Sequence, residues 1–289
     1  MKLFKKIQQV GLLKTIDDSL FNFFSFVDYK WKKLNHQPYF GSYLFSKQGN
    51  VLRHYYLEKL IEQYCTRFNN DSCKFIEIGS WAGGSAITIC KALEKHSHNS
   101  KLFCIDNWSP YFNNNEINFK KWTYRTMHNS IKKKRILKLF LYNINAAKVD
   151  YMIHILKGFS SDITPLLYPN KFDVIFIDGN HSYENVLFDL KSAEGLLKEN
   201  GIICGDDLEL QYFEIDNSNI ENIKNTDLSF DNKNKKRFHP GVTLAVHTFF
   251  KKEVSSWEGL WAMQRKNNSW KKIILSLNNE RPIIPMHLR

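Results

Sequence analysis

The sequence has few cysteines, and none of them are spaced for a shared structural role. Five cysteines occur (Cys65, Cys73, Cys90, Cys104 and Cys204), an odd number that includes no C-x-x-C pair. This pattern argues against a disulfide framework and against a structural zinc site. We therefore expect reduced, buried thiols and a cytoplasmic protein.

Long apolar runs are also missing. The longest, 20–27, is interrupted by Asn22 and Ser25, and it is far shorter than the roughly 20 residues that span a bilayer. The lysine-bearing N-terminus has no continuous apolar core followed by a small-residue cleavage site, so we predict neither a transmembrane helix nor a secretory signal. With 43% hydrophobic and 24% charged residues in 289, the composition is that of a globular protein with a sizeable core.

Acidic residues are scarce relative to basic ones. Lysine and arginine number 41 against 29 aspartate and glutamate, which gives a net charge of +12. The imbalance is strongest over residues 117–149, where nine basic residues occur without an acid. Two interpretations stay open: a solvated basic face, or a surface that attracts an anionic partner.

Strand-like runs alternate with helical patterns from residue 51 onward, which predicts an α/β fold with a doubly wound, mostly parallel sheet. Strands are predicted at 74–78, 102–105, 152–156, 172–177 and 202–205, with later candidates at 254–256, 260–264 and 270–277. Helices are predicted at 51–68, 85–95, 183–198 and 242–250. Functional residues should lie at the carboxyl ends of the strands.

The chain divides into three parts. Residues 1–50 are aromatic and basic and predict a helical extension that packs on the main domain, on a second subunit or on a membrane surface. Residues 51–278 form the main domain, and 279–289 form an irregular tail. The polar stretch 209–238 interrupts the main domain, and a stretch of this kind is a lid, an insertion or a disordered loop.

A glycine-rich segment follows the first predicted strand. It reads E-I-G-S-W-A-G-G-S from Glu77 to Ser85 and opens a helix. Its glycines allow a tight turn and close approach of a ligand to the helix N-terminus. In the dinucleotide-binding fingerprint G-x-G-x-x-G the second glycine would fall at Trp81, so this segment does not match that fingerprint. Glu77 and the strand-ending Asp106 suit a cationic amino-acid group and ribose hydroxyls, and the alternative is a glycine turn without a ligand.

Three acids end two further strands. Asp178 opens D-G-N-H-S-Y, and Asp206 and Asp207 follow the strand at 202–205. In a parallel sheet these carboxylates converge, and a hard divalent cation such as Mg²⁺ or Mn²⁺ would relieve their repulsion. His181 lies at the mouth of the same site and could accept a proton near neutral pH. Taken singly, each of these residues could instead cap a turn or a helix.

These motifs together resemble one enzyme family. E-I-G-S-x-x-G-G-S, C-I-D-N-W, F-I-D-G-N-H-S-Y-E-N-V-x-x-D-L and G-I-I-C-G-D-D are similar to the class I S-adenosylmethionine-dependent methyltransferases. Within that class they resemble the metal-dependent branch that includes macrocin-type sugar O-methyltransferases and the cephalosporin-biosynthesis methyltransferase/hydroxylase family. The resemblance covers about residues 50–270, and D-G-x-H-S-Y-E is its most specific motif.

The resemblance implies a Rossmann-like sheet of seven strands whose last two, near 254–264, form a hairpin. It also implies a role for each matching residue. The cofactor-binding positions are Glu77, Gly79, Ser80, Gly83, Ser85, Asp106, Asn107, Ser160, Ser161 and Asp178. The metal ligands are Asp178, Asp206 and Asp207, and the base is His181. The branch often has Glu-Asp where this chain has Asp206 and Asp207.

The function that follows is Mg²⁺-assisted methyl transfer from S-adenosylmethionine to a hydroxyl of a sugar, glycan or related polyol. The basic stretch 117–149 suggests an anionic acceptor, and the phenylalanine-rich N-terminal part could support a homo-oligomer. Two alternatives stay open: a nucleic-acid methyltransferase, which the charge of +12 favours but which lacks an N-P-P-[YFW] motif, and a non-catalytic cofactor-binding module. A nicotinamide-dependent oxidoreductase is disfavoured by Trp81.

Overall fold

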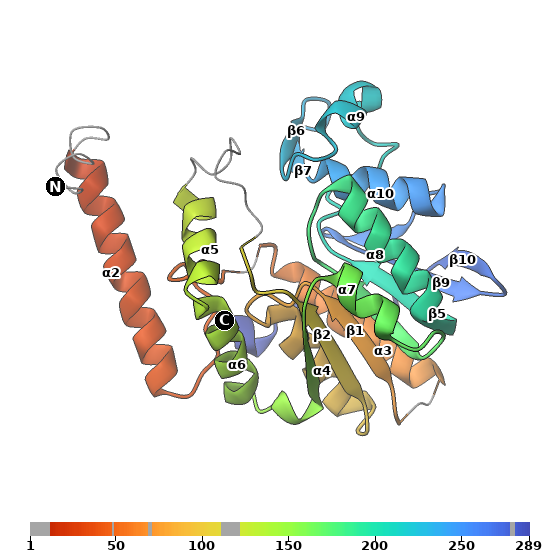
Figure 1. Ribbon diagram of the computed structural model, residues 1–289, viewed down its shortest axis with the longest axis horizontal. Helices are drawn as coiled ribbons and strands as arrows, with labels where there is room; N and C mark the ends of the chain where they lie inside the picture. Colours follow the sequence, from red (N-terminus) through yellow and green to blue (C-terminus); the bar gives the residue numbers. More distant parts are fainter. Residues whose placement is uncertain (1–11, 48, 69–70, 111–121, 278–280) are drawn as a thin grey trace.

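The computed structural model describes residues 12–47, 49–68, 71–110, 122–277 and 281–289. A single sheet lies at its centre with helices on both faces (Figure 1). The strands run in the order β10-β9-β5-β4-β1-β2-β3, and β8 also pairs with β9. Their bounds are β1 Lys74–Ile78, β2 Lys101–Asp106, β3 Ile153–Lys157, β4 Phe172–Ile177, β5 Leu197–Gly205, β8 Ser255–Trp257, β9 Leu260–Lys266 and β10 Ser269–Lys272.

Strands β1 to β5 are parallel, and the three late strands are antiparallel to their neighbours. Strands β8 and β9 form the expected hairpin. The sheet is mostly parallel and has helices on both faces, so the predicted doubly wound α/β class is confirmed. The hydrophobic runs were sufficient to predict the strands, because parallel strands buried on both faces are mostly apolar along their length.

Two hydrophobic clusters cover the two faces of the sheet, because successive strand residues point to opposite sides. Val174 and Phe176 face helices α3 (Leu52–Phe68), α4 (Gly84–His96) and α6 (Arg135–Ala146). Ile175 and Ile177 face α8 (Tyr183–Leu196) and α10 (Pro240–Phe250). The remaining helices are α2 Leu12–Leu34, α5 Trp122–Lys132, α7 Ser160–Ile163 and α9 Ile220–Ile223, with short 3-10 turns at Asp150–Met152, Thr164–Leu166, Asn217–Asn219 and Met286–Leu288.

Two predicted boundaries were wrong. Helix α8 ends at Leu196 and β5 begins at Leu197. Leu197 pairs with Phe172 and Ile202 pairs with Val174, so β5 pairs with β4 on both sides of an irregular stretch, 198–201. Strand β10 ends at Lys272. Beyond it, Ile273 exchanges two hydrogen bonds with the Ser255 hydroxyl in place of a strand ladder.

The polar stretch 209–238 is an ordered insertion in the structure. It contains α9 and the two-stranded sheet β6 (Ser229–Asp231) and β7 (Lys236–Phe238). A small cluster of Leu210, Ile215, Ile220 and Phe238 packs on Leu244 of α10. Figure 1 shows the insertion beside the N-terminal end of α10, above the carboxyl ends of the strands.

The helical extension predicted for residues 1–50 forms α2, followed by turns over residues 35–46. Side chains of α2 before Phe23, including Phe21, lie outside the described residues. Within the described ranges, the structure contains no helix with the length and apolarity that a membrane span requires. All five cysteines are buried, and none of them forms a disulfide bond.

Candidate functional site

The carboxyl ends of three neighbouring strands place the predicted residues in one crevice. The backbone N–H of Gly79 donates to Ile105 O (2.9 Å), and the N–H of Asp178 donates to Ile78 O (2.8 Å). The N–H of Asp206 donates to Ile177 O (3.1 Å). The parallel ladder therefore continues one residue past each strand, which aligns Gly79, Asp178 and Asp206 along one edge.

Gly79 is required where β1 meets β4. Its φ is +91°, and a Cβ atom there would lie 2.0 Å from the Asp178 carbonyl oxygen. No side chain fits at that distance, so only glycine lets the first loop pass directly beside the first acid. Gly83 also has a positive φ, of +90°, at the start of α4.

Glu77 lies under this loop and is fully buried. Burial raises the pKa of Glu77 from 4.5 to about 7. Its Oε2 accepts from the Cys104 thiol (3.4 Å), whereas its Oε1 has no hydrogen-bond partner among the described residues. The buried hydroxyl of Ser80, also predicted to bind cofactor, lies beside the Glu77 carboxylate. A buried, unpaired carboxylate oxygen fits the cationic amino group of S-adenosylmethionine.

Asp106 organises the loop from the next strand. Its Oδ2 accepts from the Trp81 N–H (2.9 Å) and its Oδ1 accepts from the Trp108 N–H (2.7 Å). Burial raises the pKa of Asp106 even though these backbone donors lower it. The adjacent Asn107 accepts from the Ser109 N–H (3.0 Å). The predicted ribose-binding acid thus also fixes the glycine loop, and carboxylate lone pairs remain for further donors.

Ser160 and Ser161 begin α7 beside the same edge of the sheet. The Ser160 hydroxyl bonds to Asp189 of α8, whose Oδ1 is buried and has no partner among the described residues. Burial raises the pKa of Asp189 to about 6. Ser161 is exposed and donates to Asp162 Oδ1 at 3.4 Å. Asp189 is therefore a further buried acid next to the predicted adenine-binding serines.

The three predicted metal ligands come together. One carboxylate oxygen from each of Asp178, Asp206 and Asp207 lies within 4.8 Å of the others. Burial, and then the two neighbouring acids, raise the pKa of Asp178 well above its usual range, and burial raises that of Asp206 to about 6. This donor set of carboxylate oxygens fits Mg²⁺ or Mn²⁺.

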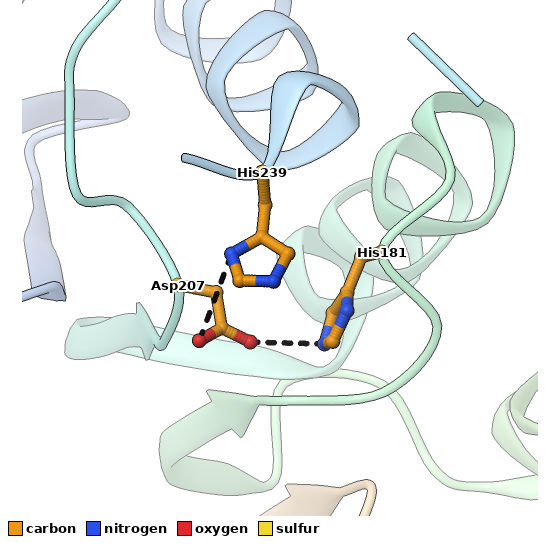
Figure 2. A group of neighbouring side chains, drawn as sticks. All are labelled: His181, Asp207 and His239. Carbon is orange, nitrogen blue, oxygen red and sulfur yellow. Dashed lines mark ion pairs between the residues drawn. The ribbon is translucent and has the colours of Figure 1, made fainter. Parts of the chain in front are cut away.

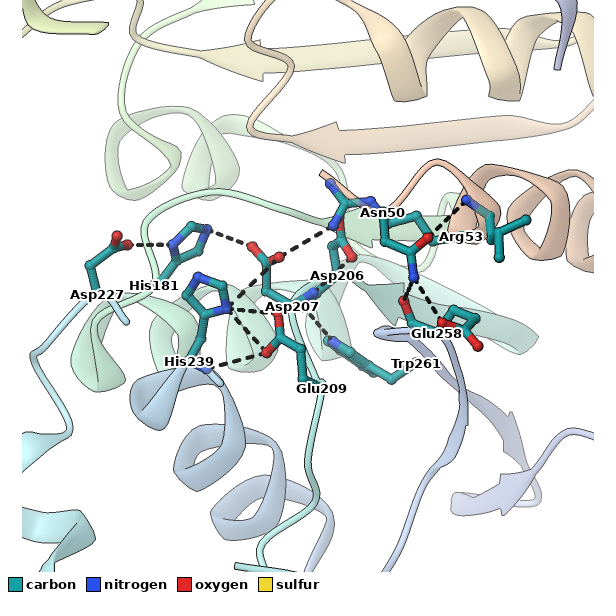
Figure 3. Close-up of polar contacts among 11 residues, drawn as sticks. Asn50, Arg53, His181, Asp206, Asp207, Glu209, Asp227, His239, Glu258 and Trp261 are labelled. Carbon is teal, nitrogen blue, oxygen red and sulfur yellow. Dashed lines mark hydrogen bonds and ion pairs between the residues drawn. The ribbon is translucent and has the colours of Figure 1, made fainter. Parts of the chain in front are cut away.

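Arg53 of α3 supplies the compensating charge in this structure. Its guanidinium pairs with the Asp206 carboxylate and lies 3.3 Å from Asp207 Oδ1 (Figure 3). A cation bound by all three acids would compete with Arg53 for Asp206 and Asp207. Arg53 also lines a small pocket with His54, Ser85 and Asp178.

His181 lies between two carboxylates. Its Nε2 is 2.9 Å from Asp207 Oδ2, and its Nδ1 is 2.7 Å from Asp227 Oδ1 in the insertion. Burial alone would lower the pKa of His181, but Asp207 and Asp227 raise it well above its ordinary value. The same contacts, with His239 and Arg53, outweigh burial and hold the pKa of Asp207 well below its usual range.

A second histidine reaches the same acid. Figure 2 shows His239, at the start of α10, facing Asp207 beside His181. Its Nδ1 is 3.9 Å from Asp207 Oδ1 and 3.1 Å from Glu209 Oε1. The His181 and His239 rings lie 4.6 Å apart at their centroids. His181, Asp207 and His239 therefore form a second group whose ligand atoms lie within 4.8 Å of one another.

Sequence reasoning missed Arg53, Asp227, His239 and Glu209. Arg53 is 154 residues from Asp207, and Asp227 is 46 residues from His181. No local motif links such positions. Two local signals were available in the sequence. H-P-G at 239–241 marks the start of a helix and includes His239, and Glu209 is an acid two residues after Asp207.

Comparison with known proteins gives one domain match. Residues 76–208 match the family described as "Methyltransferase domain". This range runs from β1 through the end of β5 and contains the glycine loop, His181 and all three clustered aspartates. The prediction of a methyltransferase is confirmed at the level of this domain, and the macrocin-type branch stays a prediction.

Relatives and solved structures are distant. An uncharacterized protein of Acanthamoeba polyphaga mimivirus is 28% identical over 155 residues, 52% of this chain, and the match spans 58% of that relative. The O-methyltransferase NovP has a TM-score of 0.51 at 16% identity, over 75% of this chain and 80% of NovP. An O-methyltransferase from Bacillus cereus in complex with SAH has a TM-score of 0.46 at 16% identity, over 76% of this chain and 84% of its own.

Proposed function

We propose that this chain is an S-adenosylmethionine-dependent O-methyltransferase that acts on a hydroxyl of a sugar, glycan or related polyol. The observation that carries the proposal is the juxtaposition of the glycine loop with the acid and histidine cluster at one sheet edge: Gly79 lies against Asp178, and Asp178 lies beside Asp206 and Asp207. Donor and acceptor sites that adjoin in this way align a methyl group with an acceptor oxygen.

The donor half of the site is the region from Glu77 to Ser85 together with Asp106. S-adenosylmethionine supplies an activated methyl group when bound. Glu77 Oε1 matches the cationic amino group, Asp106 matches the ribose hydroxyls, and Asn107, Ser160 and Ser161 lie on the adenosine side. The backbone N–H groups at the start of α4 add favourable positive potential for the carboxylate of the cofactor.

The acceptor half is the cluster around Asp207. Asp178, Asp206 and Asp207 would hold Mg²⁺ or Mn²⁺, and a cation there lowers the pKa of a nearby hydroxyl. His181 is the proposed base. Asp227 holds its Nδ1, and Asp207 now pairs with its Nε2; with Asp207 engaged by a cation, Nε2 would be released and the ring pKa would fall, so that Nε2 could accept a proton from the acceptor. Arg53 balances part of the acidic charge, and Glu209 positions His239 beside His181.

An anionic acceptor is favoured by the seven basic residues in the described part of the basic stretch, 122–149. Phosphate or carboxylate groups on a glycan pair readily with arginine and lysine. The cytoplasmic location and the homo-oligomer stay predictions.

The test measures transfer of labelled methyl from S-adenosylmethionine to a panel of sugars and polyols. We expect transfer that a chelator abolishes and Mg²⁺ restores. His181→Ala should lower turnover by at least about 100-fold, because general bases contribute that much or more, and should leave cofactor affinity within about twofold.

Each outcome bears on one part of the proposal. Activity that is indifferent to chelator would exclude the metal, and unchanged turnover in His181→Ala would remove the base. Tight cofactor binding without turnover on any acceptor would favour a non-catalytic binding module. Methylation of RNA or DNA with a steep salt dependence would favour the nucleic-acid alternative.

A further inference from the structure

Helix α2 is apolar on the face that points away from the protein. Its inner face packs through Phe26 and Tyr29, whose rings lie 5.1 Å from the Tyr43 ring. The outer side chains are among the most exposed large apolar groups in the described residues: Phe23 (59%), Phe24 (64%), Val27 (45%), Trp31 (63%) and Leu34 (76%). Their spacing of three and four residues places them on one stripe.

A basic surface adjoins this helix. Tyr142 of α6 donates to the Lys33 carbonyl (3.2 Å), and the Lys33 ammonium lies 5.5 Å from the Tyr142 ring centroid. Figure 1 shows the α5–α6 pair beside α2. The turn between α5 and α6 exposes four consecutive basic residues, Lys132, Lys133, Lys134 and Arg135, and Lys138 is exposed one turn later.

This basic turn has no acid in its neighbourhood along the chain. Residues 117–149 contain no aspartate or glutamate, and within the described part of the chain the four turn residues form no ion pair. No acid along this stretch of the chain compensates the positive charge, and the apolar stripe of α2 is exposed to solvent.

Aromatic and aliphatic side chains flanked by lysine are the composition of helices that lie in a membrane interface. Each basic residue near an anionic lipid surface adds to the attraction. A second copy of the chain would bring the same lysines against one another, which disfavours self-association through this face. A nucleic acid would match the charge and leave Val27 and Leu34 exposed to water.

We propose that the outer face of α2 and the basic α5–α6 turn dock on an anionic lipid surface. The interaction is peripheral, because α2 lies along the surface and does not cross it. It is independent of the proposed methyl transfer and can be tested without knowing the acceptor.

The experiment is cosedimentation of the full-length protein with vesicles of phosphatidylcholine alone or with about a quarter phosphatidylserine. We expect binding to the anionic vesicles that weakens as salt rises, since exposed charges are screened. Trp31→Ser/Leu34→Ser should weaken this binding by about tenfold or more, because both apolar anchors are lost. Lys132→Gln/Lys133→Gln should weaken binding to anionic vesicles and make that binding less sensitive to salt.

A matched control replaces two equally exposed side chains elsewhere. Leu166 and Tyr168 are each 77% exposed between α7 and β4, and Leu166→Ser/Tyr168→Ser should bind vesicles like the unaltered protein. The proposal is overturned if the unaltered protein does not bind anionic vesicles, or if the α2 variant binds them as strongly as the unaltered protein does. It is also overturned if the α2 variant converts a dimer to a monomer, which would identify a second copy as the occupant, or if only RNA is bound.

Discussion

At the scale of single residues, Asp207 is the centre of the site. It lies in the left-handed region, with φ of 62°, and its backbone N–H donates to Asp206 Oδ1 at 2.8 Å. This unusual conformation for a non-glycine residue turns its carboxylate toward His181 and His239. Strain of this kind persists where the surroundings hold it, which is typical of functional sites.

The first prediction concerns the contact between Asp227 and His181. Asp227→Asn removes the carboxylate that holds Nδ1 of His181, so the ring loses its fixed orientation and its proton-accepting Nε2 is misplaced. We expect kcat to fall at least about tenfold with little change in KM for S-adenosylmethionine. The measurement is steady-state methyl transfer. Asp216→Asn, at an exposed position of the same insertion, is the control, and an equal loss in both variants would contradict the role of Asp227.

The second prediction concerns Glu77 and the pH dependence of the unfolding free energy. Its pKa is raised from 4.5 to about 7 by burial, so between these values the folded state holds a proton that the unfolded chain has lost. The unfolding free energy of the cofactor-free protein therefore falls as pH rises through this interval, and this carboxyl contributes about 3 kcal/mol to the fall.

Glu77→Gln should remove that contribution. We expect the variant to be more stable than the unaltered protein above pH 7 and to bind S-adenosylhomocysteine more weakly, because a neutral amide lacks the negative charge that attracts the ammonium group. Urea unfolding at several pH values and calorimetric titration provide the two measurements. Parallel stability profiles for the two proteins would show that Glu77 is not titrating as described.

At the scale of elements, the glycine loop between β1 and α4 depends on backbone geometry. Gly79→Ala would place a methyl group 2.0 Å from Asp178 O at a φ of +91°. We expect the unfolding free energy to fall by about 3 kcal/mol or more. In Gly195→Ala the new Cβ meets no atom within 4 Å, and the same substitution inside helix α8 should raise stability by up to about 1 kcal/mol.

Urea denaturation of the two variants compares them directly. If both alanines had the same effect, the close approach of β1 and β4 would not be what requires glycine at position 79. The contrast is informative because the chemical change is identical and only the backbone environment differs.

The sheet and its loops could be predicted from the sequence because their signals are local. Apolar runs at 172–177, the turn from Gly79 and the acids after each strand all lie within a few residues of one another, and parallel pairing then brings their ends together. Arg53, Asp227 and His239 could not be found this way. They come from α3, the insertion and α10, so their positions depend on how whole elements pack.

At the scale of the whole molecule, both outer segments of the chain contact the glycine loop and the first turn of α4. Near the N-terminal end, the Phe45 carbonyl accepts from the Trp81 indole N–H (3.2 Å). Asn143 accepts from the Tyr39 N–H (2.8 Å) and donates to Ala82 O in the loop (2.9 Å). Near the C-terminal end, His287 Nε2 lies 3.1 Å from Gly84 O and 3.2 Å from Thr88 Oγ1. The first turn of α4 is thus held by residues 203 positions away.

The last prediction concerns the contact between the C-terminal segment and the first turn of α4. Burial lowers the pKa of His287 to about 4, so its ring is neutral at pH 7 and its Nε2–H donates to Gly84 O. His287→Ala should lower the unfolding free energy by about 1–3 kcal/mol, the usual cost of lost buried hydrogen bonds, and should weaken S-adenosylhomocysteine binding because the loop at Gly83 and Gly84 loses its support.

The neighbouring Met286 is 83% exposed, so Met286→Ala should change stability by less than about 0.5 kcal/mol and leave binding unaltered. Thermal unfolding with and without S-adenosylhomocysteine measures both effects on the same samples. If His287→Ala lowered stability but left the ligand-induced shift intact, the C-terminal contact would support the fold alone. The first turn of α4 would then keep its cofactor-binding geometry through Asn143 and Phe45.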